Sequence, residues 1–346
     1  MVDSPPEAAA APVVPRRRQV TRSAGLLAAL GILAVITVLG IAVGSKQIPV
    51  ADVWHGVMHY SGTDTDVIVR DVRLPRTLLG LLAGAALGLA GAVMQALTRN
   101  PLADPGVLGI NAGASAAVVT GITFFGVTSL TSYVWFAFAG AAVVSAAVYV
   151  LGGTRSATPV RLALAGTALT AALTGYLNAV NLMNTASLDK MRFWTVGSLA
   201  SATAPTVEKI APFIAVGTLL ALLLARPLNA VALGDDQARA LGAKLTRTRV
   251  LAMAAVTLLC GAATAACGPI VYVGLMVPHA VRALTGPDLR WILPYSAVLS
   301  PVLLLGADII GRIAARPGEL QVGIVTAVIG GPVFIHLVRR RKMAQL

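Results

Sequence analysis

Residues 77–97 read TLLGLLAGAALGLAGAVMQAL, and this stretch decides the fold class. It contains no charged side chain and matches the roughly 20 residues that one helix needs to cross the hydrocarbon core of a bilayer. Its many Gly and Ala residues are typical of membrane helices whose backbones approach each other closely. The stretch therefore predicts a transmembrane helix.

The rest of the chain has the composition of a protein surrounded by lipid. Of its 346 residues, 57% are hydrophobic and only 12% are charged, and the mean hydropathy is +0.81. A single soluble core would leave much of this apolar surface in water, whereas a bundle of membrane helices satisfies its backbone internally and faces lipid outward. We therefore predict an all-α, polytopic membrane protein.

Nine other apolar segments bring the number of expected spans to about ten. They cover residues 23–44, 107–127, 132–152, 162–183, 210–225, 250–266, 268–277, 292–310 and 322–338, of which 268–277 is short for a span. An even number places both termini on one side, and the distribution of Lys and Arg indicates that this side is the cytoplasm.

The expected organisation is one membrane domain with two short tails. Residues 1–22 are expected to form a flexible cytoplasmic tail, 23–338 the transmembrane domain, and 339–346 a cytoplasmic C-terminal tail. A cleaved signal peptide is the alternative for the N-terminus. The length of the 23–44 segment and the lack of a clear small-residue cleavage site disfavour it.

The formal net charge of +13 could suggest a nucleic-acid partner. The basic residues lie between apolar runs, however, and do not alternate with aromatic residues as a base-stacking surface would, so we predict no nucleic-acid binding. The two cysteines, Cys260 and Cys267, would be about 10 Å apart along a helix, too far for a disulfide. We read them as packing residues and predict no metal site and no cofactor.

The sequence contains few residues that are suited to catalysis or to ion coupling. The chain has no Gly-x-x-x-x-Gly-Lys-Ser/Thr loop to bind nucleotide phosphates, so we predict that it is not an enzyme and that energy must come from another subunit. Asp308 is the one clearly intramembrane acid, and Arg312 one helical turn later is expected to pair with it. This scarcity disfavours an ion-coupled carrier. A faint inverted similarity between 76–105 and 249–278 keeps that alternative open.

Two charged regions indicate partner contacts on opposite sides of the membrane. The cytoplasmic stretch 226–249 contains LGDDQARALG at 233–242, which predicts a short helix, a glycine break and another short helix with a small apolar face suited to a groove on a partner. Arginines also gather on the expected outer side, which indicates an acidic docking partner there. They are Arg70, Arg73, Arg76, Arg312 and Arg316.

Beyond the N-terminal tail, the sequence resembles the FecCD-type permeases of type II ABC importers, which carry iron-siderophores, haem or cobalamin. Several motifs carry this resemblance in the same order along the chain. They are Arg73-Leu-Pro-Arg76, Gly91-Ala-Val-Met-Gln-Ala-Leu97, Arg99-Asn-Pro-Leu102, the 233–242 loop, Gly268-Pro-Ile, Gly274-Leu-Met-Val-Pro-His279 and Ala307-Asp308.

The resemblance implies a role for each motif. It implies ATPase coupling at Leu233, Gly234, Ala238, Arg239, Leu241 and Gly242, and docking of the binding protein at Arg73, Arg76 and Arg312. It implies a cytoplasmic gate at Asn100, Leu102, Pro159 and Val160, where Pro159 and Val160 depart from the small hydroxyl residues of related permeases. The small residues Asn111, Gly113 and Ser115 are expected to line the translocation path.

The resemblance also implies partners and cargo. We expect two ABC ATPase subunits, a second permease subunit, an extracytoplasmic siderophore-binding protein and membrane lipid. The stretches 100–106, 111–115 and 192–198 most resemble enterobactin-type permeases, which favours an iron(III)-siderophore cargo and a heterodimer over a homodimer. A cobalamin or haem permease is the first alternative, and a secondary transporter the second.

Overall fold

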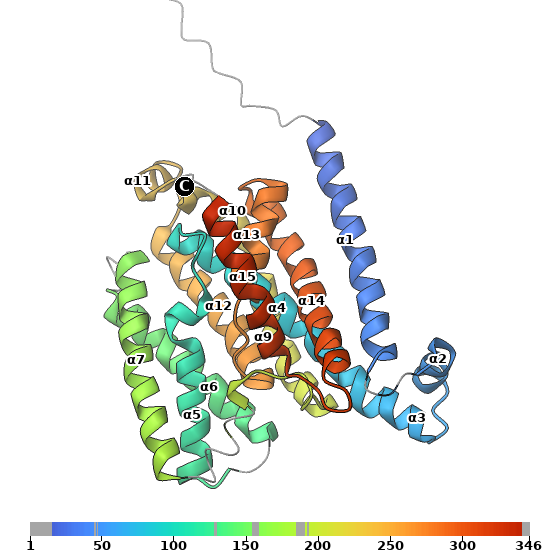
Figure 1. The fold of residues 1–346 in the computed structure, drawn as a ribbon. Helices are drawn as coiled ribbons and strands as arrows, with labels where there is room; N and C mark the ends of the chain where they lie inside the picture. The colour runs from blue at the N-terminus through green and yellow to red at the C-terminus, as the bar shows by residue number, and fades with distance from the viewer. Residues whose placement is uncertain are drawn as a thin grey trace, which may run out of the picture.

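The computed structural model describes residues 16–44, 46, 48–127, 130–153, 159–184, 191 and 194–340. Within these residues the chain is helical and contains no strand (Figure 1). The expected N-terminal tail up to residue 15, the C-terminal tail from 341, and residues 192–193 of the enterobactin-type motif lie outside the described residues.

Among the described residues, ten longer helices overlap the ten expected spans. They are α1 (Arg16–Ala42), α4 (Leu74–Thr98), α5 (Ile110–Phe124), α6 (Leu130–Leu151), α7 (Pro159–Met183), α9 (Ala204–Leu223), α12 (Leu245–Cys267), α13 (Val273–Thr285), α14 (Leu289–Ala314) and α15 (Val322–Arg340). Shorter elements join them: α2 (Val50–Met58), α3 (Asp64–Val67), the π-helix η1 (Ile68–Arg73), the 3-10 helix η2 (Pro105–Leu108), α10 (Ala225–Ala232) and α11 (Asp235–Ala240).

The described residues contain seven helices that are long and apolar enough to cross a membrane, fewer than the ten expected spans. The apolar helix α5 has 15 residues and α13 has only 13, and the part of α15 whose side chains are described as a continuous run, Val322–His336, is also shorter than a full span. The expected span 268–277 is wrong in its bounds. Gly268 has φ 72° and ends α12, and the chain stays non-helical until Val273. A left-handed glycine is a common way to end a helix.

Helix α4 forms the centre of the bundle and contacts α9, α12, α13 and α14. Its glycines allow these close contacts. A Cβ at Gly91 would overlap the carbonyl oxygen of Gly274 in α13, and a Cβ at Gly84 would lie 2.5 Å from the Cα of Pro301 in α14. The Gly/Ala content that predicted a membrane helix thus also sets how near its neighbours can come.

The two ends of the molecule carry different short helices (Figure 1). Helix α1 begins and α15 ends at the end that carries α11, which we call the α11 end. Helices α2 and α3 project at the opposite end, the α2 end, and continue through η1 into α4. An α-helix there would bring the ring of Pro75 against the carbonyl of Asp71, and the wider π-turn relieves that clash.

Candidate functional site

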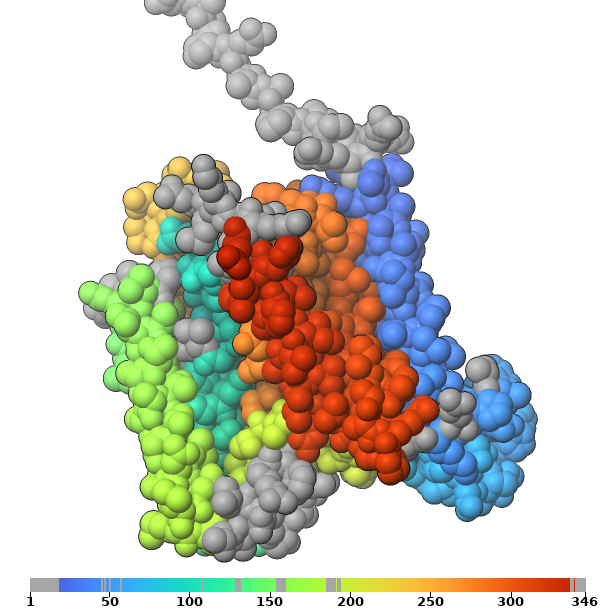
Figure 2. All heavy atoms as spheres, viewed as in Figure 1, coloured from blue at the N-terminus to red at the C-terminus, as the bar shows by residue number. Residues whose placement is uncertain are grey.

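The predicted partner-binding segment at 226–249 folds as a helix, a glycine break and a second helix, as expected. Gly234, with φ 110°, separates α10 from α11, and Gly242, with φ 78°, ends the turn after α11. Asn229 in α10 binds Asp288 at 2.7 Å and accepts a hydrogen bond from the N–H of Leu289, which anchors α10 to the start of α14. Figure 2 shows α11 projecting from the surface at this end.

The apolar residues of this segment divide into two groups. Leu233 is 57% exposed and Leu241 is 67% exposed, so both are free to contact a partner. Ala238 is fully buried and packs with Val231 and Leu245 of this chain. The expectation that Ala238 belongs to the docking face is therefore corrected: its methyl group holds α11 against α10 and α12.

An acid in α11 connects this segment to the turn that follows α4. Asp235 accepts from the guanidinium of Arg99 through Oδ1 and from that of Arg249 through Oδ2, both at 2.7 Å. Partial desolvation raises the pKa of Asp235, but the hydrogen bond from Arg249 and the nearby arginine charges outweigh it, so the pKa lies below its ordinary value. The Asp235 carboxylate is therefore held in its charged form.

The predicted gate residues meet around one cavity of about 450 Å³ between α4 and α7, the α4–α7 cavity. Asn100 and Leu102 reach it from the turn after α4, and Val160 reaches it from the first turn of α7. Pro159 begins α7, and its side chain lies outside what the structure describes. The full lining is Met94, Thr98, Asn100, Leu102, Ala103, Val160, Ala163, Leu164 and Thr167.

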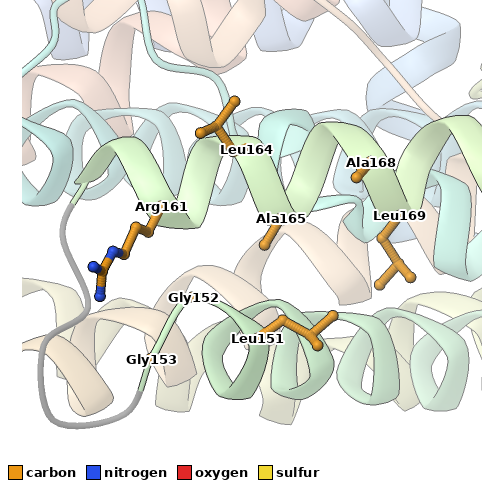
Figure 3. A pocket seen from close by; sticks show the side chains of 8 residues that line it. All are labelled: Leu151, Gly152, Gly153, Arg161, Leu164, Ala165, Ala168 and Leu169. Carbon is orange, nitrogen blue, oxygen red and sulfur yellow. The ribbon is translucent and has the colours of Figure 1, made fainter.

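A second cavity, of about 640 Å³, lies on the other flank of α7, the α6–α7 cavity (Figure 3). Figure 3 shows Arg161, Ala165 and Leu169 on the side of α7 that faces Leu151 of α6. Leu164 borders both cavities. The first turns of α7 thus have space on two sides, which leaves this part of the helix room to shift without overlapping its neighbours.

Beyond its first turns, α7 packs closely against its neighbours beside Gly109. Gly109 has φ 71°, and a Cβ there would lie 3.0 Å from Val144 of α6 and 3.3 Å from the hydroxyl of Thr170 in α7. Toward the α2 end, Thr120 of α5 and Tyr176 of α7 share a hydrogen bond of 2.7 Å. The loosely packed part of α7 therefore lies beside the gate residues.

The three predicted docking arginines are buried together, and we call Arg73, Arg76, Asp308, Arg312 and Glu319 the arginine cluster. Arg76 binds Asp308 at 2.8 Å and Glu319 at 2.7 Å, while Arg312 binds Asp308 at 3.1 Å. The predicted Asp308–Arg312 pair is thus confirmed, and Arg76 is a second partner. A small cavity of about 220 Å³ opens beside the cluster.

Arg73 and Arg312 of the cluster also bind the end of α1. Arg73 donates to the carbonyls of Ile41 and Ala42 at 2.8 and 2.7 Å, and Arg312 donates to that of Gly40 at 2.9 Å. The last carbonyls of a helix lack intrahelical partners and carry partial negative charge, which suits cations. The charges of these arginines are therefore bound within the chain, where they connect α1, α4 and α14. The arginines exposed nearby are Arg70 and Arg316.

The three residues predicted to line the path lie in helix contacts. Thr264 of α12 donates to the side-chain oxygen of Asn111 at 3.0 Å, and Ser115 donates to the Asn111 carbonyl at 2.8 Å. A Cβ at Gly113 would lie 2.6 Å from the carbonyl oxygen of Gly140 in α6. In this structure these residues pack α5 against α6 and α12.

A polar helix face that the sequence analysis did not single out lies on α7. Thr167, Thr174 and Asn178 are exposed on one side of this helix. Its span, 160–183, has the lowest mean hydropathy of the seven candidate spans in the described residues, 1.3, and little of it is buried. Polar side chains are costly in lipid, so this face suits a protein or aqueous neighbour. The low mean hydropathy of residues 160–183 was the feature of the sequence that could have identified this polar face.

Comparisons with known proteins agree along nearly the whole chain. A model of the FecCD transport family matches residues 32–340. The ferric enterobactin transport system permease protein FepD of Escherichia coli (strain K12) is 48% identical, over 93% of this chain and 97% of its own. The Fe(3+)-citrate import system permease protein YfmD of Bacillus subtilis (strain 168) is 39% identical, over 94% and 97%.

A solved structure supports the same assignment. A metal-chelate type ABC transporter in an inward-facing conformation superposes with a TM-score of 0.83 at 26% identity, covering 92% of this chain and 100% of its own. The agreement of motifs, fold and sequence identity leads to one conclusion. This chain belongs to the FecCD transport family.

Proposed function

We propose that this chain is the transmembrane permease subunit of an ATP-driven importer that carries iron(III)-siderophore complexes into the cytoplasm. The observation that carries the proposal is the 48% identity to a ferric enterobactin permease over nearly the full length of both chains. The siderophore supplies the iron ligands, so the permease needs a passage for the complex and no metal site of its own.

Energy enters from two ATPase subunits that bind at the α11 end, which we place in the cytoplasm. The exposed Leu233 and Leu241 supply apolar contacts, and Arg239, on the exposed side of α11, supplies charge. Ala238 fixes α11 to its own chain, so that movement of the ATPases displaces α11 and its neighbours together.

Cargo arrives from an extracytoplasmic binding protein at the α2 end. The exposed Arg70 and Arg316 and the cavity beside the arginine cluster support an acidic partner, because arginine pairs with carboxylates in a two-pronged geometry. The cluster joins α1, α4 and α14, so binding there acts on three helices at once.

The path itself is shared with a second permease subunit. The exposed polar face of α7 supports this placement, since lipid is a poor neighbour for Thr167, Thr174 and Asn178. The gate lies at the α4–α7 cavity, where Asn100 and Leu102 face Val160. A shift of the first turns of α7 would widen or close that point.

Transport into sealed proteoliposomes tests the proposal. The vesicles contain this chain with its ATPase, second permease and binding protein, and import of radiolabelled iron(III)-enterobactin is measured with and without ATP on the ATPase side. We expect import only when ATP and the binding protein are both present. Import driven by a proton gradient alone would contradict the proposal, and import of haem or cobalamin in preference to the siderophore would reassign the cargo.

A further inference from the structure

The side chain of Asp235 is the direct polar link between α11 and the turn that follows α4. Its Oδ1 accepts from Nη2 of Arg99, and its Oδ2 accepts from Nη2 of Arg249, each at 2.7 Å. Arg99 is 136 residues away in the sequence and belongs to a different part of the fold. Three elements, α4, α11 and α12, thus meet at one carboxylate.

Arg99 is rigidly joined to the predicted gate. It is the C-cap of α4 and has a left-handed backbone, with φ 52°, which is uncommon for a residue other than glycine. The next residue, Asn100, accepts a hydrogen bond from the N–H of Leu102 through its side chain, at 2.9 Å. Both of those residues line the α4–α7 cavity. A force on the Arg99 guanidinium therefore acts on a turn that has little freedom to absorb it.

Asp235 is equally well joined to α11. It is the first residue of that helix and follows Gly234, whose φ of 110° permits the sharp change of direction. Ala238, one turn later, packs α11 onto Val231 and Leu245. Displacement of α11 must therefore move the Asp235 carboxylate or break its two ion pairs.

We infer that Asp235 is a positioning residue that transmits movement of α11, through Arg99, to the turn that contains the gate residues Asn100 and Leu102. Arg249 of α12 holds the Asp235 carboxylate in position. The inference rests on the proposed function, because it assigns a role to the same two sites. It adds a direct contact between two motifs, through Arg99 and Asp235, and a supporting role for Arg249, which lies in neither motif.

A neighbouring ion pair provides a matched comparison. Asp236 binds Arg239 at 3.3 Å within α11, and the Asp236 side chain is 98% exposed. This pair has the same chemistry one residue further along but reaches no other element. Asp235 and Arg99 are each about one-third exposed, at 30% and 31%, and pairs of that kind contribute little to stability. Loss of the Asp235–Arg99 contact should therefore alter coupling more than folding, and Arg99→Gln removes this contact while leaving Asp235 paired with Arg249, whose side chain is 12% exposed.

The test measures siderophore imported per ATP hydrolysed by the complete transporter in proteoliposomes. Asp235→Asn and Arg99→Gln should each lower this ratio by about fivefold or more while ATP hydrolysis continues, in line with typical coupling between sites. The double variant should lose no more than either single variant, because both changes break the same contact. Arg99→Lys, which keeps the charge, should recover part of the ratio.

The control is Asp236→Asn, which should keep the wild-type ratio even if it changes the rate of ATP hydrolysis. A wild-type ratio in Asp235→Asn and Arg99→Gln, additive losses in the double variant, or an equal loss in Asp236→Asn would each overturn the inference. A fall in the melting temperature of the variants that accounts for the lost transport would also overturn it. Failure of the wild-type transporter to import with ATP would instead contradict the proposed function.

Discussion

Single glycines determine how closely the central helices pack. The contact between Gly91 and Gly274 leaves no space for a side chain, so a methyl group on Gly91 must push α4 and α13 apart. We expect Gly91→Ala to lower stability by about 1–3 kcal/mol, the usual cost of overpacking a core. Thermal unfolding of the purified protein in detergent measures this.

Gly306 in α14 is the matched control, since nothing lies within 4 Å of a Cβ built there. Gly306→Ala should leave the melting temperature unchanged or raise it slightly, because alanine favours a helix over glycine. Equal effects of the two substitutions would show that the α4–α13 contact does not limit stability.

The buried Asp308 is expected to be structural. Two arginines share its carboxylate, and its side chain is 1% exposed. Asp308→Asn should leave the buried Arg312 without its acid and Arg76 with Glu319 alone, and should lower stability by about 3–5 kcal/mol. The yield of folded protein and its melting temperature report the loss. Arg70→Gln at the exposed α2 end should have no such effect, and similar losses in both variants would argue against this role.

At the level of elements, α11 combines an inner and an outer face. Leu241→Asp changes an exposed residue and should reduce ATPase association without lowering the melting temperature of this chain. Ala238→Asp places a charge between Val231 and Leu245, and should lower both ATPase association and the melting temperature of this chain. Co-purification with the ATPase, together with thermal unfolding, separates the two effects. Unchanged association in Leu241→Asp would place the ATPase elsewhere.

Helix α7 is the element that we expect to move at the gate. Leu102 and Val160 line the α4–α7 cavity from different elements, so a short bifunctional thiol reagent should connect cysteines placed at these two positions. The cross-link should stop import and leave ATPase association intact.

A cross-link between cysteines at Thr98 and Leu102 is the control, because both positions lie on the same side of the gate. Import should continue in that variant. Continued import with the Leu102–Val160 cross-link in place would show that the gate opens elsewhere. The native thiols are unsuited to the reagent, since Cys260 and Cys267 are buried.

For the whole molecule, the arrangement of the two ends predicts the topology. The α11 end carries the start of α1 and the end of α15, and α3 lies at the opposite end (Figure 1). Arg70 belongs to η1, which directly follows α3. In intact cells, a membrane-impermeant maleimide should label Arg70→Cys but not Leu241→Cys. Inverted vesicles should give the reverse result. Labelling of both positions from one side would contradict this topology.

Much of the fold was predictable because hydropathy is a local property. Nine of the ten expected spans coincide largely with a helix, the tenth, 268–277, overlaps α13 only from Val273, and the glycine break at Gly234 was expected from the sequence. The number of full-length spans was not predictable in this way, because α5, with 15 residues, and α13, with 13, are too short to span a membrane by themselves. Helix α1 also begins at Arg16, before the expected start at residue 23, since no helix-breaking residue separates the arginines from the apolar run.

The sequence by itself determined the membrane class, the helical pattern and the family motifs, since each depends on residues close together in the chain. The tertiary structure decided which predicted site residues are accessible: it buries Ala238 and the docking arginines and leaves Leu241 exposed. It alone decided that Asp235 meets Arg99, because that contact depends on how α4 and α11 pack. Such pairs form between helix faces whose orientation is set by the packing of the whole bundle, and no local pattern specifies that orientation.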